Sequence, residues 1–511
     1  MGLPKSSLGE LFLGFSVNSR DTNWESIVPR SIAVHSGLVE PGAVFFAIPG
    51  AKHDGGQFVQ EATERGASAV VCAEHASVAE CPVPIISVAD VRAALAWVSA
   101  RFYRQPTSDL LCFGVTGTNG KTSVSWIVAQ ALTALGKPAA LCGTLGLGLP
   151  EGQGGFTFES SANTTVDPLT LQGFLARARE QKICAASVEV TSQALVQHRT
   201  AGVEWDIGLF TNLTRDHLDL HGSMERYGAA KMTFFSDQLA RSRKPNRLAV
   251  VNIDDPFGIE ICRVLAEREP SIRVLEYSTA SQAAAARLMK KSGSLDRTVM
   301  TCRIDGREIE FEAKLIGDYN VSNLLGAATA LVGAGFEPDA VSEALGRVPP
   351  VPGRLEVVAS GDFSVVVDYA HSPDGLVQAQ HSLRPLTAGR LITVFGCGGD
   401  RDRGKRPLMG EAVRKLADVA IVTSDNPRSE NPEGILDDIE PGLRGTDARK
   451  GFAAERVVDR RDAIRKALTL ARKGDVVLVA GKGHEDYQEI AGTRFPFSDK
   501  EVCRELLSEL R

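Results

Sequence analysis

The 511-residue chain lacks any apolar run near the ~20 residues that a bilayer-spanning helix needs. Its first residues mix Lys5, Glu10 and Gly14 among apolar ones, so a secretory signal peptide is not expected. Basic and acidic side chains number 57 and 63, which gives no excess of positive charge. This balance argues against a nucleic-acid-binding surface and against a polybasic membrane anchor.

The nine cysteines are scattered, with no Cys-x-x-Cys pair and no spacing typical of a zinc site. Such an odd, unpatterned set favours reduced thiols in the cytoplasm over a disulfide framework. We find no internal repeat and no low-complexity segment, and we expect the alanine run 283–286 to be a solvated helix. Length and an ordinary 43% hydrophobic content predict about three globular domains.

The most informative segment present is a glycine-rich turn that ends in Gly-Lys-Thr. We predict a strand at 110–113, the turn at 114–123 and a helix at 124–135. This arrangement offers backbone N–H groups and the positive end of a helix dipole to a polyphosphate. Lys121 would reach the β- and γ-phosphates, and the Thr122 hydroxyl would bind Mg²⁺. Val115 replaces a P-loop glycine, so the motif is a variant form; the alternative is an ordinary βα turn.

Short apolar strands alternate with helices along the chain, which is typical of α/β domains with parallel sheets. Linkers at 104–108 and at the proline-rich segment 348–353 suggest three domains, 1–108, 109–349 and 350–511. The first is a small α/β domain, the second a P-loop ATPase-like parallel-sheet domain, and the third a Rossmann-like doubly wound domain. Strands are predicted at 44–48, 69–73, 186–190, 207–210, 248–252, 364–367, 391–395, 419–423 and 476–479, and further helices at 57–65 and 91–102.

Chemistry-bearing residues follow several of these strands, at the sheet edge where open α/β sheets bind ligands. Glu189 ends one apolar strand, Thr211–Asp219 follows another, and Lys231 comes next. Together with Gly114–Thr122, these residues closely resemble the Mur ligases, the ATP-dependent amide-forming enzymes of peptidoglycan synthesis. The resemblance runs from about residue 30 to the C-terminus.

Two further segments, Phe395–Pro407 and Ala480–Gln488, are similar to one branch of that family. That branch adds the third residue of the stem peptide to UDP-N-acetylmuramoyl-L-alanyl-D-glutamate, and so serves cell-wall biogenesis, cell shape and cell division. Ser424–Arg428 resembles the form that takes meso-2,6-diaminopimelate, whereas lysine-adding relatives differ at the arginine. The resemblance implies activation of the D-glutamyl γ-carboxylate by ATP, through an acyl phosphate, followed by amide formation.

The resemblance also implies roles for individual residues. The catalytic residues would be Lys121, Glu189, His217 and Lys231, with Mg²⁺ held by Thr122, Glu189, His217 and Lys231 as its carbamate (N6-carboxylysine). Carbamate formation needs a neutral amine, so burial must lower the pKa of Lys231. The alternative for Lys231 is a lysine paired with phosphate or an aspartate.

Three sets of ligand contacts follow from the same resemblance. ATP would be bound by Gly117, Thr118, Asn119, Gly120, Lys121, Thr122, Ser123, Asn323 (rather than its neighbour Asn320), Arg354 and Asp368. The N-terminal domain and its neighbour would bind the UDP-substrate through Ser36, Asn163, Thr164, Thr165, Ser192, Gln197 and Arg199. The C-terminal domain would bind diaminopimelate through Arg401, Asp425, Asn426, Pro427, Arg428, Gly481 and Glu485. The chain departs from the family pattern at His35-Ser36-Gly37 and at Gln193, both on the UDP-substrate side.

Selection of the third amino acid depends on Arg428. Meso-diaminopimelate has one more carboxylate than lysine, and the planar guanidinium would hold that group at two points, while Glu485 would meet the distal ammonium. Lysine would leave Arg428 without its anion, and such unpaired sites can reject an analogue by ~10⁴-fold.

The alternatives are a lysine-adding ligase, MurF, folylpolyglutamate synthase, or a non-catalytic nucleotide-binding regulator. The Asp-Asn-Pro-Arg and Gly-Lys-Gly-His-Glu segments argue against the other ligases, and retention of all four catalytic residues argues against a regulator. A mechanical P-loop NTPase would lack the two extra domains. We expect a cytoplasmic monomer with small-molecule partners only, whose domains meet around one magnesium-bearing cleft.

Overall fold

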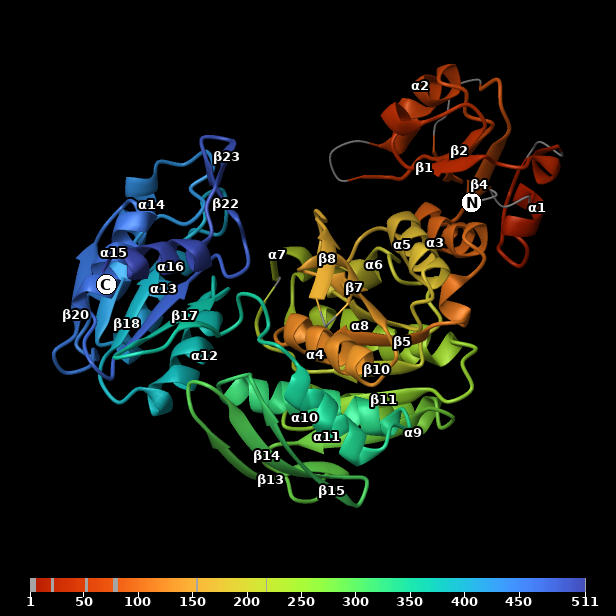
Figure 1. The fold of residues 1–511 in the computed structure, drawn as a ribbon. Helices are drawn as coiled ribbons and strands as arrows, with labels where there is room; N and C mark the ends of the chain where they lie inside the picture. The colour runs from red at the N-terminus through yellow and green to blue at the C-terminus, as the bar shows by residue number, and fades with distance from the viewer. Residues whose placement is uncertain are drawn as a thin grey trace. The chain divides into compact units, whose positions relative to one another are not determined.

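The computed structural model describes residues 6–19, 23–50, 54–76, 81–152, 155–216 and 218–510, without the side chains of residues 218 and 219. Contacts divide the chain into two units, Met1–Tyr277 with Thr329–Gly335 and Ser278–Ala328 with Phe336–Arg511. Figure 1 labels helices and strands of both units. Within the described ranges, no helix has both the length and the apolar character that crossing a bilayer requires.

The first unit begins with a small parallel sheet in the order β1-β2-β3-β4. Its strands are β1 (Ser31–Ala33), β2 (Ala43–Phe46), β3 (Ala69–Ala73) and β4 (Ile85–Val88). Its helices are α1 (Leu8–Leu11), α2 (Val59–Glu64) and α3 (Val91–Phe102). Asp90 starts α3 by accepting hydrogen bonds from two backbone N–H groups of the first turn, which satisfies donors that the helix itself leaves unpaired. Apolar side chains of α1, α3 and the strands form the core of this part.

A larger sheet follows in the order β12-β11-β10-β5-β9-β6-β7-β8, parallel from β12 to β6 and antiparallel at β7 and β8. Its strands are β5 (Leu111–Thr116), β6 (Ala139–Gly143), β7 (Gly146–Glu151), β8 (Gly155–Glu159), β9 (Ala185–Glu189), β10 (Ile207–Phe210), β11 (Leu248–Asn252) and β12 (Arg273–Ser278). The helices are α4 (Lys121–Ala134), α5 (Pro168–Glu180), α6 (Ser192–Val196), α7 (Leu218–His221), α8 (Met224–Thr233), which continues as a π-helical turn (Phe234–Leu239), and α9 (Pro256–Arg268). The central strands β5, β9, β10 and β11 are buried almost throughout, because helices pack against the sheet.

The second unit contains a run of three antiparallel strands and a doubly wound sheet. The first is β15-β14-β13, formed by β13 (Ala286–Gly293), β14 (Thr298–Ile304) and β15 (Arg307–Ala313), with α11 (Pro338–Arg347) packed on β15. Helix α10 (Asp318–Gly333) starts in this unit.

The doubly wound sheet has the order β16-β17-β21-β18-β19-β20 and is parallel except for β16. Its strands are β16 (Glu356–Ala359), β17 (Ser364–Asp368), β18 (Leu391–Phe395), β19 (Val419–Val422), β20 (Ala453–Arg456) and β21 (Val476–Ala480), beside a hairpin of β22 (Tyr487–Ile490) and β23 (Thr493–Pro496). Helices α12 (Pro373–Leu383), α13 (Lys405–Leu416), α14 (Pro432–Leu443), α15 (Arg460–Leu470) and α16 (Asp499–Glu509) enclose it in two apolar layers.

The predicted α/β class with a small N-terminal domain, a central parallel-sheet domain and a C-terminal doubly wound domain is confirmed. Five predicted elements agree to the residue, namely 69–73, 91–102, 207–210, 248–252 and 391–395. The expectation of a solvated helix at the alanine run is wrong, because Ala284 is buried and Ala286 begins β13. Pairing with β14 outweighs the intrinsic helix preference of alanine there. The bounds of the three domains remain predictions.

Candidate active site

The glycine-rich turn lies between β5 and α4 and is held by the segment that follows β10. Thr118 donates its backbone N–H to the carbonyl of Asn212 at 2.8 Å. A Cβ on Gly117 would lie 1.9 Å from Thr211 Oγ1, so only glycine fits at this position. Lys121 folds over the turn and donates to the carbonyls of Gly117 and Thr118 at 2.9 and 2.7 Å. The turn, this lysine and the N-terminus of the 14-residue helix α4 form a cradle suited to a phosphate chain.

Glu189 ends β9, and its buried carboxylate lies beside the first turn of α4. Thr122 Oγ1 donates to Glu189 Oε2 at 3.0 Å. The N–H and hydroxyl of Thr144 donate to Glu189 Oε1 and Oε2 at 2.8 and 3.2 Å. Gly143 leaves room for this carboxylate, because a Cβ there would lie 2.2 Å from Oε1. The strand order β5-β9 therefore places a carboxylate and a hydroxyl together at the end of the phosphate cradle.

Lys231 lies on α8 and is buried beneath the same turn. Its ammonium donates to the carbonyl of Gly117 at 2.8 Å, the carbonyl that Lys121 also contacts, and lies 4.5 Å from the ring centroid of Tyr227. Burial and the charge of Lys121 lower the pKa of Lys231 well below its usual value, while Asp216 opposes this shift. A depressed pKa supplies the neutral amine that reaction with CO₂ requires, so this environment suits the predicted carbamate.

The described part of the predicted magnesium site supplies oxygen ligands. His217, one of the four predicted ligands, lies outside the described residues. Within those residues, no group of three or more His, Cys, Asp and Glu side chains could hold a metal ion. The Thr122 hydroxyl and the Glu189 carboxylate, 3.0 Å apart, nevertheless fit Mg²⁺, which prefers hard oxygen donors and keeps several waters.

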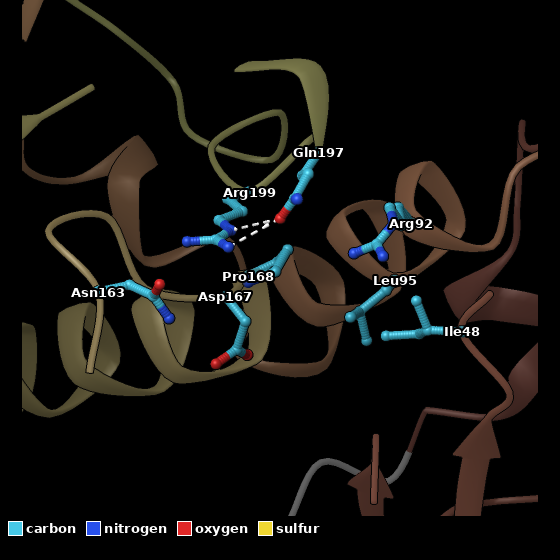
Figure 2. A pocket seen from close by; sticks show the side chains of 8 residues that line it. All are labelled: Ile48, Arg92, Leu95, Asn163, Asp167, Pro168, Gln197 and Arg199. Atoms are coloured by element: carbon cyan, nitrogen blue, oxygen red, sulfur yellow. Dashed lines mark hydrogen bonds between the residues drawn. The ribbon is translucent and has the colours of Figure 1, made fainter. Parts of the chain in front are cut away.

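A cavity of about 110 Å³ lies in the first unit, and Figure 2 shows the side chains that line it. These are Ile48, Arg92, Leu95, Asn163, Asp167, Pro168, Gln197 and Arg199. Arg199 is held there by two hydrogen bonds to Gln197 Oε1, at 3.0 and 2.7 Å, and by one to the carbonyl of Thr165 at 2.6 Å. Three predicted UDP-substrate residues, Asn163, Gln197 and Arg199, thus line one cavity together with Arg92. Two guanidinium groups against the one carboxylate of Asp167 leave this lining with a net positive charge, which suits an anionic ligand.

The other predicted UDP-substrate residues lie elsewhere in this unit. Thr165 is buried and donates its hydroxyl to the last carbonyl of β9 at 2.7 Å, and Thr164 precedes it. Ser192 starts α6, and its hydroxyl shares a hydrogen bond of 2.9 Å with Nε2 of His221 on α7. Ser36 begins a short 3₁₀ turn after β1 and does not line the cavity.

In the second unit, the residues predicted to contact ATP surround the start of α10 and the end of β17. Asn323 and Asn320 are buried on α10 and are joined by a hydrogen bond of 3.0 Å. The Arg354 guanidinium lies 4.6 Å from the ring centroid of Tyr369. Asp368 ends β17 and accepts two backbone N–H hydrogen bonds at 2.7 and 2.8 Å. Burial raises the pKa of Asp368, and Arg354 opposes this shift.

Arg428 follows β19 in the left-handed region, with φ at +52°. Its N–H donates to the carbonyl of Glu489 on β22 at 3.0 Å. The guanidinium donates to the carbonyl of Gly399 at 2.7 Å. A Cβ on Gly398 would lie 2.9 Å from Arg428 Nη1 and 3.9 Å from Arg401 Cγ. The loop after β18 is therefore bordered by both arginines that were predicted to contact diaminopimelate.

The remaining predicted diaminopimelate residues come from the loops after β19 and β21. Asn426 Nδ2 donates to Glu485 Oε2 at 2.9 Å. Gly481, with φ at +123°, packs closely on Asp425, because a Cβ would lie 2.8 Å from Asp425 Oδ2. Pro427, which lies between Asn426 and Arg428 in the sequence, is buried. Burial raises the pKa of Glu485, although the positive charge of Lys482 opposes this shift.

Sequence reasoning missed two residues of these sites. Thr144 contacts Glu189 with its N–H and its hydroxyl, but a threonine after a short apolar strand carries no specific signal. Lys482 lies within the recognised segment Gly481–Glu485 and is fully buried, with Nζ 3.0 Å from Asn426 Oδ1. A lysine inside an otherwise glycine-rich turn would have been the signal for a paired, buried charge.

Three family models match the chain consecutively. They describe the Mur ligase family catalytic domain at residues 30–103, the Mur ligase middle domain at 115–331 and the Mur ligase glutamate ligase domain at 353–483.

Curated relatives match nearly the whole chain. A UDP-N-acetylmuramoyl-L-alanyl-D-glutamate–2,6-diaminopimelate ligase of Pseudomonas putida is 42% identical over 478 residues, covering 92% of this chain and 93% of the relative. The protein of the same name from Gloeobacter violaceus is 39% identical and covers 100% and 99%. A solved structure of a ligase of this name has a TM-score of 0.70 at 33% identity and covers 96% and 97%. MurF from Acinetobacter baumannii, at 16% identity and a TM-score of 0.64, shows a likeness of fold alone.

Proposed function

Because this chain belongs to the Mur ligase family, we propose that it is an ATP-dependent ligase that adds meso-2,6-diaminopimelate to UDP-N-acetylmuramoyl-L-alanyl-D-glutamate. The amide bond forms at the D-glutamyl γ-carboxylate, as a step of peptidoglycan synthesis. Near-full-length identity of 39–42% to ligases named for this reaction supports the assignment.

The P-loop region is proposed to bind ATP and Mg²⁺. Lys121 and the N-terminus of α4 hold the β- and γ-phosphates, which would draw the lysine from the two carbonyls that it contacts. Thr122, Glu189 and His217, with Lys231 as its carbamate, hold the metal. When bound, Mg²⁺ neutralises charge that develops on the transferred phosphoryl group. On the second unit, Asn323, Arg354 and Asp368 are the proposed contacts to the nucleotide.

The reaction needs charge neutralisation and alignment more than covalent catalysis. An oxygen of the γ-carboxylate attacks the γ-phosphorus, the bond to ADP breaks, and an acyl phosphate forms. The amine nitrogen of diaminopimelate then attacks the acyl carbon, loses a proton and displaces phosphate. Lys121 keeps the phosphoryl group in line, and its charge opposes the repulsion between the carboxylate and the phosphate chain.

The UDP-substrate is proposed to lie against the cavity of the first unit. Arg199 and Gln197 are coupled by two hydrogen bonds, and Arg92 adds a second cation to the lining. This set suits the anionic parts of the substrate. Asn163, Thr164, Thr165 and Ser192 would continue the contacts toward the reacting carboxylate, and Ser36 is the proposed contact from the N-terminal domain.

The observation that carries the choice of diaminopimelate is that Arg428 and Glu485 lie on two neighbouring loops. The Arg428 guanidinium donates to the carbonyl of Gly399. Glu485 accepts a hydrogen bond from Asn426, which lies two residues before Arg428 in the sequence. A guanidinium and a carboxylate presented by adjoining loops match the distal carboxylate and ammonium of diaminopimelate. Lysine offers only the ammonium.

The test supplies the purified chain with Mg-ATP, the UDP-muramoyl-dipeptide and, separately, meso-diaminopimelate, L-lysine and D-alanyl-D-alanine. We expect one product mass, that of the diaminopimelate adduct, together with ADP and phosphate. Lys121→Ala in the same mixture is the matched control and should give none. Equal use of lysine would refute the assignment of Arg428, and no product with any amine would refute the proposed reaction.

The proposed setting is a cytoplasmic monomer that acts on small molecules. All nine cysteines are free thiols, which fits a reducing compartment. Cell fractionation tests the location, and light scattering of the purified chain tests the monomer, which a dimer mass would contradict.

A further inference from the structure

Lys482 is a buried cation at the junction of the two loops that carry the proposed diaminopimelate contacts. It follows β21, and its side chain is 0% exposed. Its Nζ lies 3.0 Å from Asn426 Oδ1, 3.4 Å from Glu485 Oε2 and 3.8 Å from Asp425 Oδ1. The ring centroid of Tyr487 lies 5.5 Å from the same nitrogen. A buried lysine is costly unless it is paired, so its retention at this place needs a reason.

One consequence of these contacts is that Asn426 has a single satisfied orientation. Its Oδ1 accepts from Lys482 Nζ and from the N–H of Glu489, both at 3.0 Å. Its Nδ2 must then face Glu485, and it donates to Oε2 at 2.9 Å. Lys482 therefore orients Asn426 directly. It also contacts Glu485 Oε2, the oxygen that accepts from Asn426.

A second consequence concerns charge. Lys482 brings a positive charge to a junction that also holds Asp425 and Glu485. The same two loops carry Arg428, Glu430, His484 and Asp486, and Arg401 lies near Arg428. The distal end of diaminopimelate is an ammonium and a carboxylate, which sum to zero. The distal end of lysine is a single cation. Removing the positive charge of Lys482 makes this junction one unit more negative, which favours a lone cation over a zwitterionic group.

We infer that Lys482 is a positioning and specificity-determining residue, which orients Asn426 and Glu485 and whose positive charge favours a zwitterionic distal group over a lone cation. The inference rests on the proposed function and names the part of it that Arg428 alone does not supply. Lys482 itself needs no contact with the amino acid, because it acts through Asn426 and Glu485.

The test compares kcat and KM for meso-diaminopimelate and L-lysine in the wild type, Lys482→Met and Lys482→Gln. Losing a charged hydrogen bond should lower kcat/KM for diaminopimelate about 10- to 100-fold, mainly through KM. The preference for diaminopimelate over lysine should fall in the same range.

A pH profile separates this role from a purely structural one. Glu485 is faced by Lys482, Asp425, Tyr369 and Tyr487, and its pKa is already raised by burial and lowered by Lys482. Because Glu485 must be ionised to meet the ammonium, its protonation sets an acid limb of kcat/KM. Removing Lys482 raises the pKa further, so this limb should move to higher pH.

Arg414→Met is the matched control. Arg414 lies on α13, is also a buried cation, and donates to the backbone carbonyl of Gly442 at 2.7 Å. This substitution should lower thermal stability without moving the selectivity or the acid limb. Wild-type selectivity and pH profile in Lys482→Met, or in Lys482→Gln if the first variant does not fold, would overturn the inference. A wild-type chain that does not ligate diaminopimelate would instead overturn the proposed function.

Discussion

Replacing Arg428 tests the proposed substrate most directly. Its guanidinium donates to the carbonyl of Gly399 at 2.7 Å. Gly398 has no side chain and so leaves room for Arg428 Nη1, because a Cβ there would lie 2.9 Å from that nitrogen. The Arg428 backbone is tied to β22 by the N–H donated to Glu489 and by the carbonyl that accepts from Ala491 at 2.7 Å. These contacts hold the Arg428 backbone and anchor its guanidinium at the carbonyl of Gly399 before any substrate binds.

The expected loss follows from two charged hydrogen bonds to the distal carboxylate. At about 1.5–3 kcal/mol each, Arg428→Ala should cost about 3–6 kcal/mol of transition-state binding. That corresponds to a fall of about 10²–10⁴ in kcat/KM for meso-diaminopimelate. The KM for ATP should stay unchanged. Arg428→Lys should recover little, since an ammonium cannot make the same planar two-point contact.

The assay follows ADP release with meso-diaminopimelate or L-lysine as the variable substrate. Arg428→Gly is the matched control, because φ at +52° suits glycine better than alanine and both variants lack the guanidinium. Equal losses in the two variants would assign the effect to the guanidinium. Activity retained in Arg428→Gly but lost in Arg428→Ala would assign it to the backbone, and unchanged diaminopimelate kinetics in both would refute the selectivity argument.

Three further outcomes are expected. Lys121→Ala should lower kcat by about 10³-fold or more through lost electrostatic positioning, measured as ADP release, with Lys121→Arg as the control for charge. Gly117→Ala should lower the free energy of unfolding by about 1–3 kcal/mol in a denaturant titration, because its Cβ would lie 1.9 Å from Thr211 Oγ1; unchanged stability would contradict this. Hydrogen bonds from Arg406 lower the pKa of Glu430 from 4.5 to about 2, so its stabilisation is complete above pH 4.5 and is lost as the pH falls toward 2. The thermal midpoint should therefore fall less steeply over this range in Glu430→Gln than in the wild type.

The sequence predicts best those elements whose residues are buried on both faces. Strands 207–210 and 248–252 are buried throughout and consist almost wholly of apolar residues, so their ends lie at or next to the ends of the apolar runs. The antiparallel strands were not predicted, because β15 contains three glutamates and lacks the continuous apolar run on which the parallel strands were predicted. The prediction of a solvated helix at 283–286 was wrong for a related reason. Its burial comes from the pairing of β13 with β14, which local helix propensity does not record.

The candidate site could be predicted as a set of residues but not as a set of contacts. Thr122 and Glu189 are 67 residues apart, and Asn426 and Glu485 are 59 apart, so no local pattern joins either pair. The sheet order joins them instead: β9 pairs with β5, and β19 and β21 flank β18. Parallel strands bring their carboxyl ends to one edge, and only there does Lys482 acquire its three polar neighbours. A motif therefore identifies which loops bear function, whereas the balance of charge within a pocket depends on which loops the topology makes adjacent.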